Sequence, residues 1–203
     1  NESKIGMYIG DVSGHGVSAA MLTVFLNQSM KTKKENAQGF KEILPPSKVL
    51  ANIYSDYNQT EFSSEVYIAM LYGIFDLATR ELTFASAGLN VPPLIASHSG
   101  DVSELKIKGL PICKFAASQK VEYRDSTISL YRGNRVLFYT DGLIELASPD
   151  NKVYSSSEMK ALLHKNSHMN AHQLSDSITE HVFKFIGDRK LRDDITFFVM
   201  EVK

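Results

Sequence analysis

Three acidic sites in this sequence share a local context that could support chemistry. Asp11, Asp141 and the pair Asp193-Asp194 each stand where an apolar run meets a turn. Strand ends can gather residues that are distant in sequence at one rim of a sheet, where side chains are firmly aimed and still reach solvent. Carboxylates gathered there repel one another unless a cation neutralises them, and oxygen ligands select hard divalent ions such as magnesium or manganese. The pattern therefore favours a metal site.

Each of these sites has a simpler interpretation when it is taken alone. An aspartate before a glycine, as in Asp141-Gly142, is typical of a turn, and Asp193-Asp194 is compatible with a turn or a strand cap. The run 14–16, Gly-His-Gly, is compatible with a tight turn that carries an exposed histidine, or with an anion-binding helix start. Spacing alone leaves these alternatives open.

Composition and charge exclude several classes of protein. The chain has 203 residues, of which 43% are hydrophobic and 22% are charged, and its formal net charge is -1. These values are typical of a globular protein and lack the basic excess of a nucleic-acid-binding one. No apolar run approaches the roughly 20 residues that cross a bilayer, and the start lacks the apolar core of a signal peptide. With Cys113 as its single cysteine, no internal disulfide forms, which favours a reducing compartment. We expect a cytoplasmic protein, or the cytoplasmic domain of a larger, membrane-anchored one.

The elements that must position the carboxylates follow from hydrophobic periodicity. Alternation over 5–9 predicts a strand that ends at Asp11, and helical spacing predicts a helix over 17–30, directly after the glycine-bearing loop. The polar stretch 31–39 predicts a surface loop, and a second helix is expected over 47–58. Further strands are predicted at 66–76, 81–87, 93–96, 121–130, 135–140 and 194–202, and further helices at 156–165 and 170–186. Strands and helices in separate blocks indicate an α+β fold with antiparallel sheets flanked by helices.

The literal residues around Asp11 are more specific than their spacing. The run 10–16 reads Gly-Asp-Val-Ser-Gly-His-Gly, Ala19-Ala20-Met21 follows it, and together they resemble the signature of the SpoIIE-type branch of the PPM metal-dependent protein phosphatases. Further blocks agree in order: Ala-Ser-Ala-Gly at 85–88 with Pro-Pro-Leu at 92–94, Gly-Leu-Pro at 109–111, Phe-Tyr-Thr-Asp-Gly-Leu-Ile-Glu at 138–145 and Arg-Asp-Asp-Ile-Thr at 192–196. The resemblance covers essentially the whole chain. It implies one domain over residues 1–203, a four-layer α-β-β-α sandwich of two antiparallel sheets that lacks its most N-terminal strands.

The resemblance also implies a site and a reaction. The activity implied is metal-dependent hydrolysis of phosphoserine or phosphothreonine, with two divalent cations, Mn²⁺ or Mg²⁺. Asp11 would bridge both ions, the backbone carbonyl of Val12 would hold one, and Asp141 with Asp193 would hold the other. Asp194 is implied as an outer ligand or as support. Metal-assisted attack of water on phosphorus needs no covalent phosphoenzyme.

His15 is the candidate proton donor to the leaving serine oxygen. In the larger eukaryotic branch a histidine follows the bridging aspartate by two residues, whereas His15 follows Asp11 by four, so a loop-shaping or exposed histidine is the favoured alternative. Two further departures concern the family pattern. The Gly-Gly-Asp block expected upstream, whose acid completes the second metal site, is outside this sequence. Asn90-Val91 stands before Pro92 where the family has a histidine-bearing block, which leaves substrate contacts there open.

Two other patterns could be mistaken for sites. His164, His168 and His172 recur every four residues, as zinc ligands on one helix would, but the residues at 166–170 interrupt that helix. We expect these histidines to face solvent. Cys113 has no activating histidine nearby in the sequence, so we expect a partly buried, small apolar residue rather than a nucleophile.

Two functions are compatible with the resemblance. The first is an active phosphatase of bacterial signalling that acts on a phosphorylated STAS-domain anti-sigma-factor antagonist and is controlled by a sensor or receiver domain in the same full-length chain. The second is a catalytically silent domain that keeps the fold and binds a protein partner. Intact Asp11, Asp141 and Asp193 favour the first. No nucleic-acid partner is expected, and a homodimer is one option for the oligomeric state.

Overall fold

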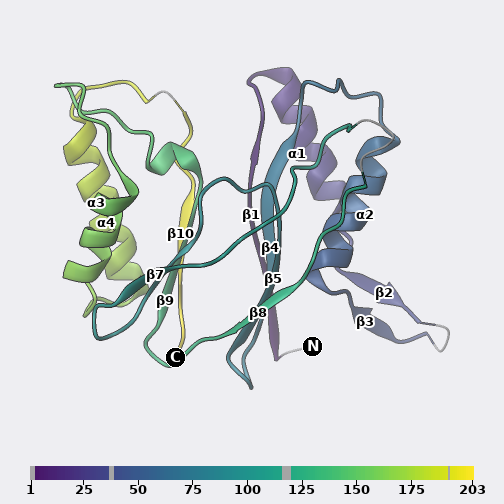
Figure 1. Ribbon diagram of the computed structural model, residues 1–203, viewed down its shortest axis with the longest axis horizontal. Helices are drawn as coiled ribbons and strands as arrows, with labels where there is room; N and C mark the ends of the chain where they lie inside the picture. Colours follow the sequence, from purple (N-terminus) through teal and green to yellow (C-terminus); the bar gives the residue numbers. More distant parts are fainter. Residues whose placement is uncertain (1–2, 37–38, 116–119, 192) are drawn as a thin grey trace. The chain divides into compact units, whose positions relative to one another are not determined.

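The chain forms two compact units, each built on one four-stranded antiparallel sheet with two helices (Figure 1). The computed structural model describes residues 3–36, 39–115, 120–191 and 193–203. Unit 1 comprises residues 1–89 and 107–129, and unit 2 comprises residues 90–106 and 130–203. This composition confirms the predicted α+β class. None of the described helices is both long and apolar enough to cross a membrane.

The sheet of unit 1 has the strand order β1-β4-β5-β8. Its strands are β1 (Lys4–Val12), β4 (Ile68–Asp76), β5 (Glu81–Ala87) and β8 (Ser126–Ser129). Helices α1 (Val17–Ser29) and α2 (Pro46–Asn58) lie on one face of this sheet (Figure 1). Alternate residues of β4 point to that face and are buried with both helices, namely Ile68, Met70 and Tyr72. Burial of this apolar face is the main force that holds the unit together.

Helix α1 is confirmed, but of the five apolar residues whose spacing predicted it only Phe25 packs against the core, and the other four are exposed, namely Val17, Ala20, Met21 and Val24. Val17, Met21 and Val24 are 77%, 56% and 56% exposed, whereas Leu22 and Leu26 are buried against the sheet. The helix is apolar on more than one side, so periodicity identified the element without identifying its buried face.

The predicted surface loop at 31–39 is wrong in part. Strands β2 (Lys33–Glu35) and β3 (Lys41–Ile43) pair antiparallel into a separate two-stranded sheet, while residues 37 and 38 lie outside the described residues. The charged sequence Lys-Lys-Glu of β2 has no apolar alternation, so it carries no strand signal. The predicted strand at 121–130 is also too long, because only β8 at its end is a strand.

The sheet of unit 2 has the strand order β10-β9-β6-β7. Its strands are β6 (Leu94–Ala96), β7 (Val102–Glu104), β9 (Arg135–Tyr139) and β10 (Phe197–Glu201), of which β7 was not predicted and β10 is shorter than predicted. Helices α3 (Ser156–Lys165) and α4 (Ala171–Ile186) lie on one face of this sheet (Figure 1). Leu137 and Tyr139 of β9 are buried with Leu163, Leu174 and Ile178 of the helices.

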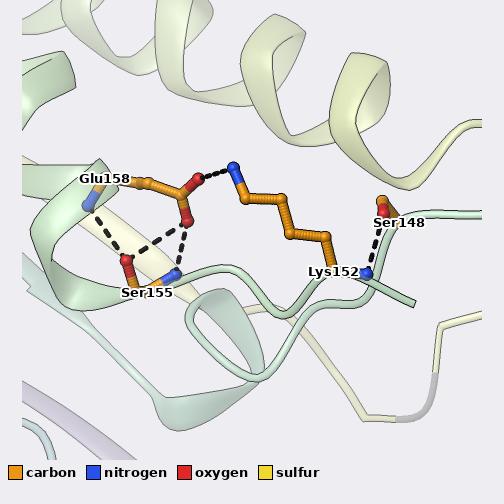
Figure 2. Close-up of polar contacts among 4 residues, drawn as sticks. All are labelled: Ser148, Lys152, Ser155 and Glu158. Atoms are coloured by element: carbon orange, nitrogen blue, oxygen red, sulfur yellow. Dashed lines mark hydrogen bonds and ion pairs between the residues drawn. The ribbon is translucent and has the colours of Figure 1, made fainter. Parts of the chain in front are cut away.

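A capping box fixes the start of α3 (Figure 2). The Ser155 hydroxyl accepts from the Glu158 N–H at 3.3 Å, and the Glu158 carboxylate accepts from the Ser155 N–H at 2.9 Å. Two donors that a helix start leaves without partners are therefore satisfied. The Lys152 ammonium bonds the other Glu158 oxygen at 2.6 Å, and the Lys152 N–H donates to the Ser148 hydroxyl at 3.1 Å. These bonds tie the chain before α3 to its first turn.

We expect Glu158→Gln to destabilise the protein by about 0.5 kcal/mol at neutral pH, because the amide keeps the capping contacts and loses the ion pair. The Lys152 ammonium and the Ser155 backbone hold the pKa of Glu158 below its usual 4.5. A lowered pKa in the folded state gives stability that is complete above pH 4.5 and is lost as the pH falls below it. Urea unfolding from pH 7 to pH 3 should show the difference from wild type shrinking. The exposed Glu180 of α4 provides the control variant Glu180→Gln, and a difference independent of pH would contradict the ion-pair explanation.

Candidate metal centre

Asp11 and Val12 are the last two residues of β1, in unit 1. They pair with Ala69 and Ile68 of β4, so the strand runs one residue further than predicted. Both residues are half-buried. Because the strand ladder fixes the backbone here, the direction of the Val12 carbonyl and the start of the Asp11 side chain are fixed as well.

The loop after β1 is held by one serine. The Ser13 N–H donates to the Tyr67 carbonyl at 3.0 Å, and the Ser13 hydroxyl accepts from the Tyr67 N–H at 2.7 Å. Gly14 and Gly16 then adopt φ values of 86° and 74°, which are strained for residues with a side chain. His15 lies exposed between them. The loop is thus anchored at Ser13 and turns on its two glycines into α1.

In unit 2 the ends of two paired strands bring the other candidate ligands together. Asp141 begins the 3₁₀ turn η1 (Asp141–Leu143) directly after β9, and the Asp193-Asp194 pair precedes β10. The Thr140 N–H donates to the Thr196 carbonyl at 3.0 Å, which holds the two strand ends side by side. The prediction that these aspartates lie at the ends of strands is therefore confirmed within unit 2.

Gly142 lets the backbone that follows β9 approach the backbone that precedes β10, and these two strand ends are called the unit 2 rim. A Cβ at Gly142 would overlap the carbonyl of Asp194, so no larger residue is compatible with this backbone. Gly142 and Asp193 also line one small cavity of about 90 Å³. The Asp193 carboxylate accepts from the Asp194 N–H at 2.8 Å. Arg192, the first residue of the closing block, lies outside the described residues.

Asn90 is a polar neighbour of Asp141 that sequence reasoning did not assign. Its side-chain amide donates to Asp141 Oδ2 at 2.5 Å, and the Gly142 N–H donates to Asp141 Oδ1 at 3.1 Å. The sequence marked Asn90 only as a departure from the family block. The signal that could have found it is its place two residues before Pro92, between the matching blocks 85–88 and 92–94.

The chemistry of these donors fits a hard divalent cation. Asp141 and Asp193 offer carboxylate oxygens only, and Mg²⁺ is commonly held by one or two carboxylates and completes its shell with water. Over the described parts of the chain, no group of three or more His, Cys, Asp or Glu side chains could hold a metal ion.

The histidine pattern does not form a zinc site among the described residues. Helix α3 ends at Lys165 and α4 begins at Ala171, so the three histidines do not share one helix. All three are exposed, as expected; His164 also bonds the Gly100 carbonyl at 2.7 Å.

Cys113 is half-buried, as predicted. Burial raises the pKa of its thiol, which disfavours the thiolate form that a nucleophile needs.

The fold is that of PP2C-type protein phosphatase domains. The chain resembles the SiaA-PP2C domain of Pseudomonas aeruginosa with a TM-score of 0.80 and 18% identity, covering 99% of this chain and 81% of that chain. It also resembles RsbX, whose crystal structure is a complex with magnesium, with a TM-score of 0.64 and 16% identity over 100% of this chain and 83% of that chain. Likeness at this level of identity shows the fold.

The family model for Stage II sporulation protein E (SpoIIE) matches residues 1–203, and the chain therefore belongs to the SpoIIE family. The chain is similar to the phosphoserine phosphatase RsbU of Bacillus subtilis (strain 168), with 24% identity over 203 residues. The match covers 100% of this chain and 57% of RsbU, so the chain spans little more than half the length of that relative. The resemblance inferred from the sequence is confirmed.

Proposed function

We propose that this chain is the catalytic domain of a metal-dependent phosphoprotein phosphatase that hydrolyses phosphoserine or phosphothreonine. The observation that carries the proposal is the unit 2 rim, where Asp141 lies beside the Asp193-Asp194 turn on paired strand ends. Membership of the SpoIIE family and similarity to the phosphoserine phosphatase RsbU support the same activity.

The metal ligands we propose are Asp11 as the bridging carboxylate, the Val12 carbonyl for one ion, and Asp141 with Asp193 for the other. Asp194 is a supporting or outer ligand. Magnesium in the complex of the similarly folded RsbX supports a hard divalent cation, Mg²⁺ or Mn²⁺. When bound, two such ions supply an activated water and neutralise charge on the phosphoryl oxygens.

The residues of the chain contribute orientation and proton transfer. The β1 ladder fixes Asp11, and the Ser13–Tyr67 bonds keep the following loop in place. His15 is exposed on that loop and is the candidate donor of a proton to the leaving oxygen, with a loop-shaping role as the alternative.

We further propose that the substrate is a phosphorylated STAS-domain regulatory protein in sigma-factor control. A sensor or receiver domain of the full-length protein would regulate the activity, in the cytoplasm or on the cytoplasmic side of a membrane. The similarity to RsbU supports this assignment. The alternative is a catalytically silent domain that keeps the fold and binds a protein partner.

Phosphate release from a phosphoserine STAS-domain protein tests the proposal. We expect the full-length protein to release phosphate with Mn²⁺, to stop when the ion is chelated, and to resume when Mn²⁺ is restored. Release that continues unchanged in the chelator would contradict a metal-dependent mechanism. Tight binding of the phosphoprotein without release at any Mn²⁺ concentration would favour the silent domain.

A further inference from the structure

Asn90 occupies a position that is fixed by the core of unit 2. The next residue, Val91, is only 4% exposed and is buried in the same cluster as Leu143 and Leu146. Those two leucines belong to the segment that begins at Asp141. Asn90 and Asp141 are 51 residues apart in sequence, and their backbones are anchored in one hydrophobic cluster. The core therefore fixes the backbone next to both residues, while the Asn90 side chain itself is exposed.

The chemistry of the contact fixes its orientation. An ionised carboxylate only accepts hydrogen bonds, so Asn90 must present its NH₂ group to Asp141 Oδ2. The Gly142 N–H bonds the other oxygen, Oδ1. Each carboxylate oxygen has about two lone-pair directions and thus keeps one for another partner. Both torsions of the Asp141 side chain are restrained while both oxygens stay able to bind a cation.

We propose that Asn90 is a positioning residue for Asp141, and that its amide holds the carboxylate in the orientation that binds the divalent cation. This inference rests on the proposed function, since the carboxylate is held for a metal. Partners that orient a metal ligand typically change metal affinity by about 10- to 100-fold when they are removed. The residue that departs from the family block is thereby given a role that does not involve the substrate.

Mn²⁺ binding, followed by electron paramagnetic resonance of the free ion, tests this role without relying on turnover. We expect Asn90→Ala to weaken Mn²⁺ binding by about 10- to 100-fold, and Asn90→Gln, which retains the amide, to restore part of it. In an Asp141→Ala background the Asn90→Ala change should have no further effect. Asn134 provides the matched control, because its side chain bonds the Tyr131 N–H in a turn before β9. Asn134→Ala should leave Mn²⁺ affinity unchanged.

A second measurement separates this inference from the proposed function. In the metal-free protein, the NMR signal of the Asn90 side-chain amide should shift when Asp141 is replaced by alanine. An unshifted signal, or wild-type Mn²⁺ affinity in a folded Asn90→Ala variant, would overturn the positioning role and leave the phosphatase proposal standing. If the signal shifts on Asp141→Ala replacement but the wild-type protein binds no Mn²⁺, the metal-dependent function is refuted, and the metal-positioning role with it.

Discussion

Replacing Asp11 by alanine is expected to lower kcat/KM for phosphoserine hydrolysis by more than about 100-fold. Residues that only orient a metal ligand already change affinity or activity by about 10- to 100-fold, and a carboxylate that bridges two ions should matter more. The Asp11 backbone is fixed by pairing with Ala69, so the variant should remove the carboxylate without moving the strand. Steady-state kinetics on a phosphoserine protein at several Mn²⁺ concentrations provide the measurement.

Two companion variants sharpen this test. Asp11→Asn keeps the shape of the side chain and removes its charge, so it should lose nearly as much activity as alanine. Asp150→Asn alters an aspartate on an exposed turn and should keep wild-type kinetics. Thermal unfolding of each variant shows whether the fold survives. Equal rates for Asp11→Ala and the wild type would contradict the catalytic role proposed for this residue.

Replacing Arg135 by methionine should destabilise the fold by about 3 kcal/mol. Arg135 is only 3% exposed, and its guanidinium donates to the Met169 carbonyl at 2.9 Å and the Ser97 carbonyl at 3.0 Å. It therefore joins the β6–β7 turn to the α3–α4 connection. Its strand partner Glu201 accepts from the Ala171 N–H at 3.1 Å, at the start of α4. Methionine fills a similar volume but leaves the Met169 carbonyl without this donor and the Ser97 carbonyl with only the Gly100 N–H at 3.2 Å. A hydrogen bond from a charged group typically contributes about 1.5 to 3 kcal/mol, and two are lost.

Urea unfolding measures this loss, and two further variants identify its cause. Arg135→Lys keeps the charge but presents a single ammonium, which cannot serve both carbonyls with the geometry of a guanidinium, so an intermediate loss is expected. Arg132→Met changes an exposed arginine three residues away and should alter stability by less than about 0.5 kcal/mol. A loss below about 1 kcal/mol for Arg135→Met would show that the buried guanidinium is not a main support of unit 2.

Much of the fold was predictable because its signals are local. Helix α3 has the predicted bounds, since Ser155 and Glu158 form a capping box at the spacing that such a box requires. Strand β5 also has its predicted bounds, where apolar and polar residues alternate. The acidic residues at strand ends were found in the same way, because each follows or precedes an apolar run.

The remaining features depend on contacts that no local pattern encodes. The charged strands β2 and β3 exist because they pair with each other, and neither has an apolar alternation that predicts a strand. Apolar spacing on α1 predicted one face, yet of its residues only Phe25 packs against the core, and Leu22 and Leu26 supply the buried side. Several faces of that helix are apolar, so only the position of the sheet decides which one is buried.

By itself, the sequence determined the family, the α+β class and the carboxylates with which a metal-dependent phosphatase would work, because motifs and periodicity are properties of neighbouring residues. Only the tertiary structure decided that Arg135 is buried and that Asn90 bonds Asp141. Each of those contacts joins residues more than 30 positions apart. Such contacts arise when the packing of a common core brings distant segments together, and a pattern read along the chain carries no record of which segments will meet.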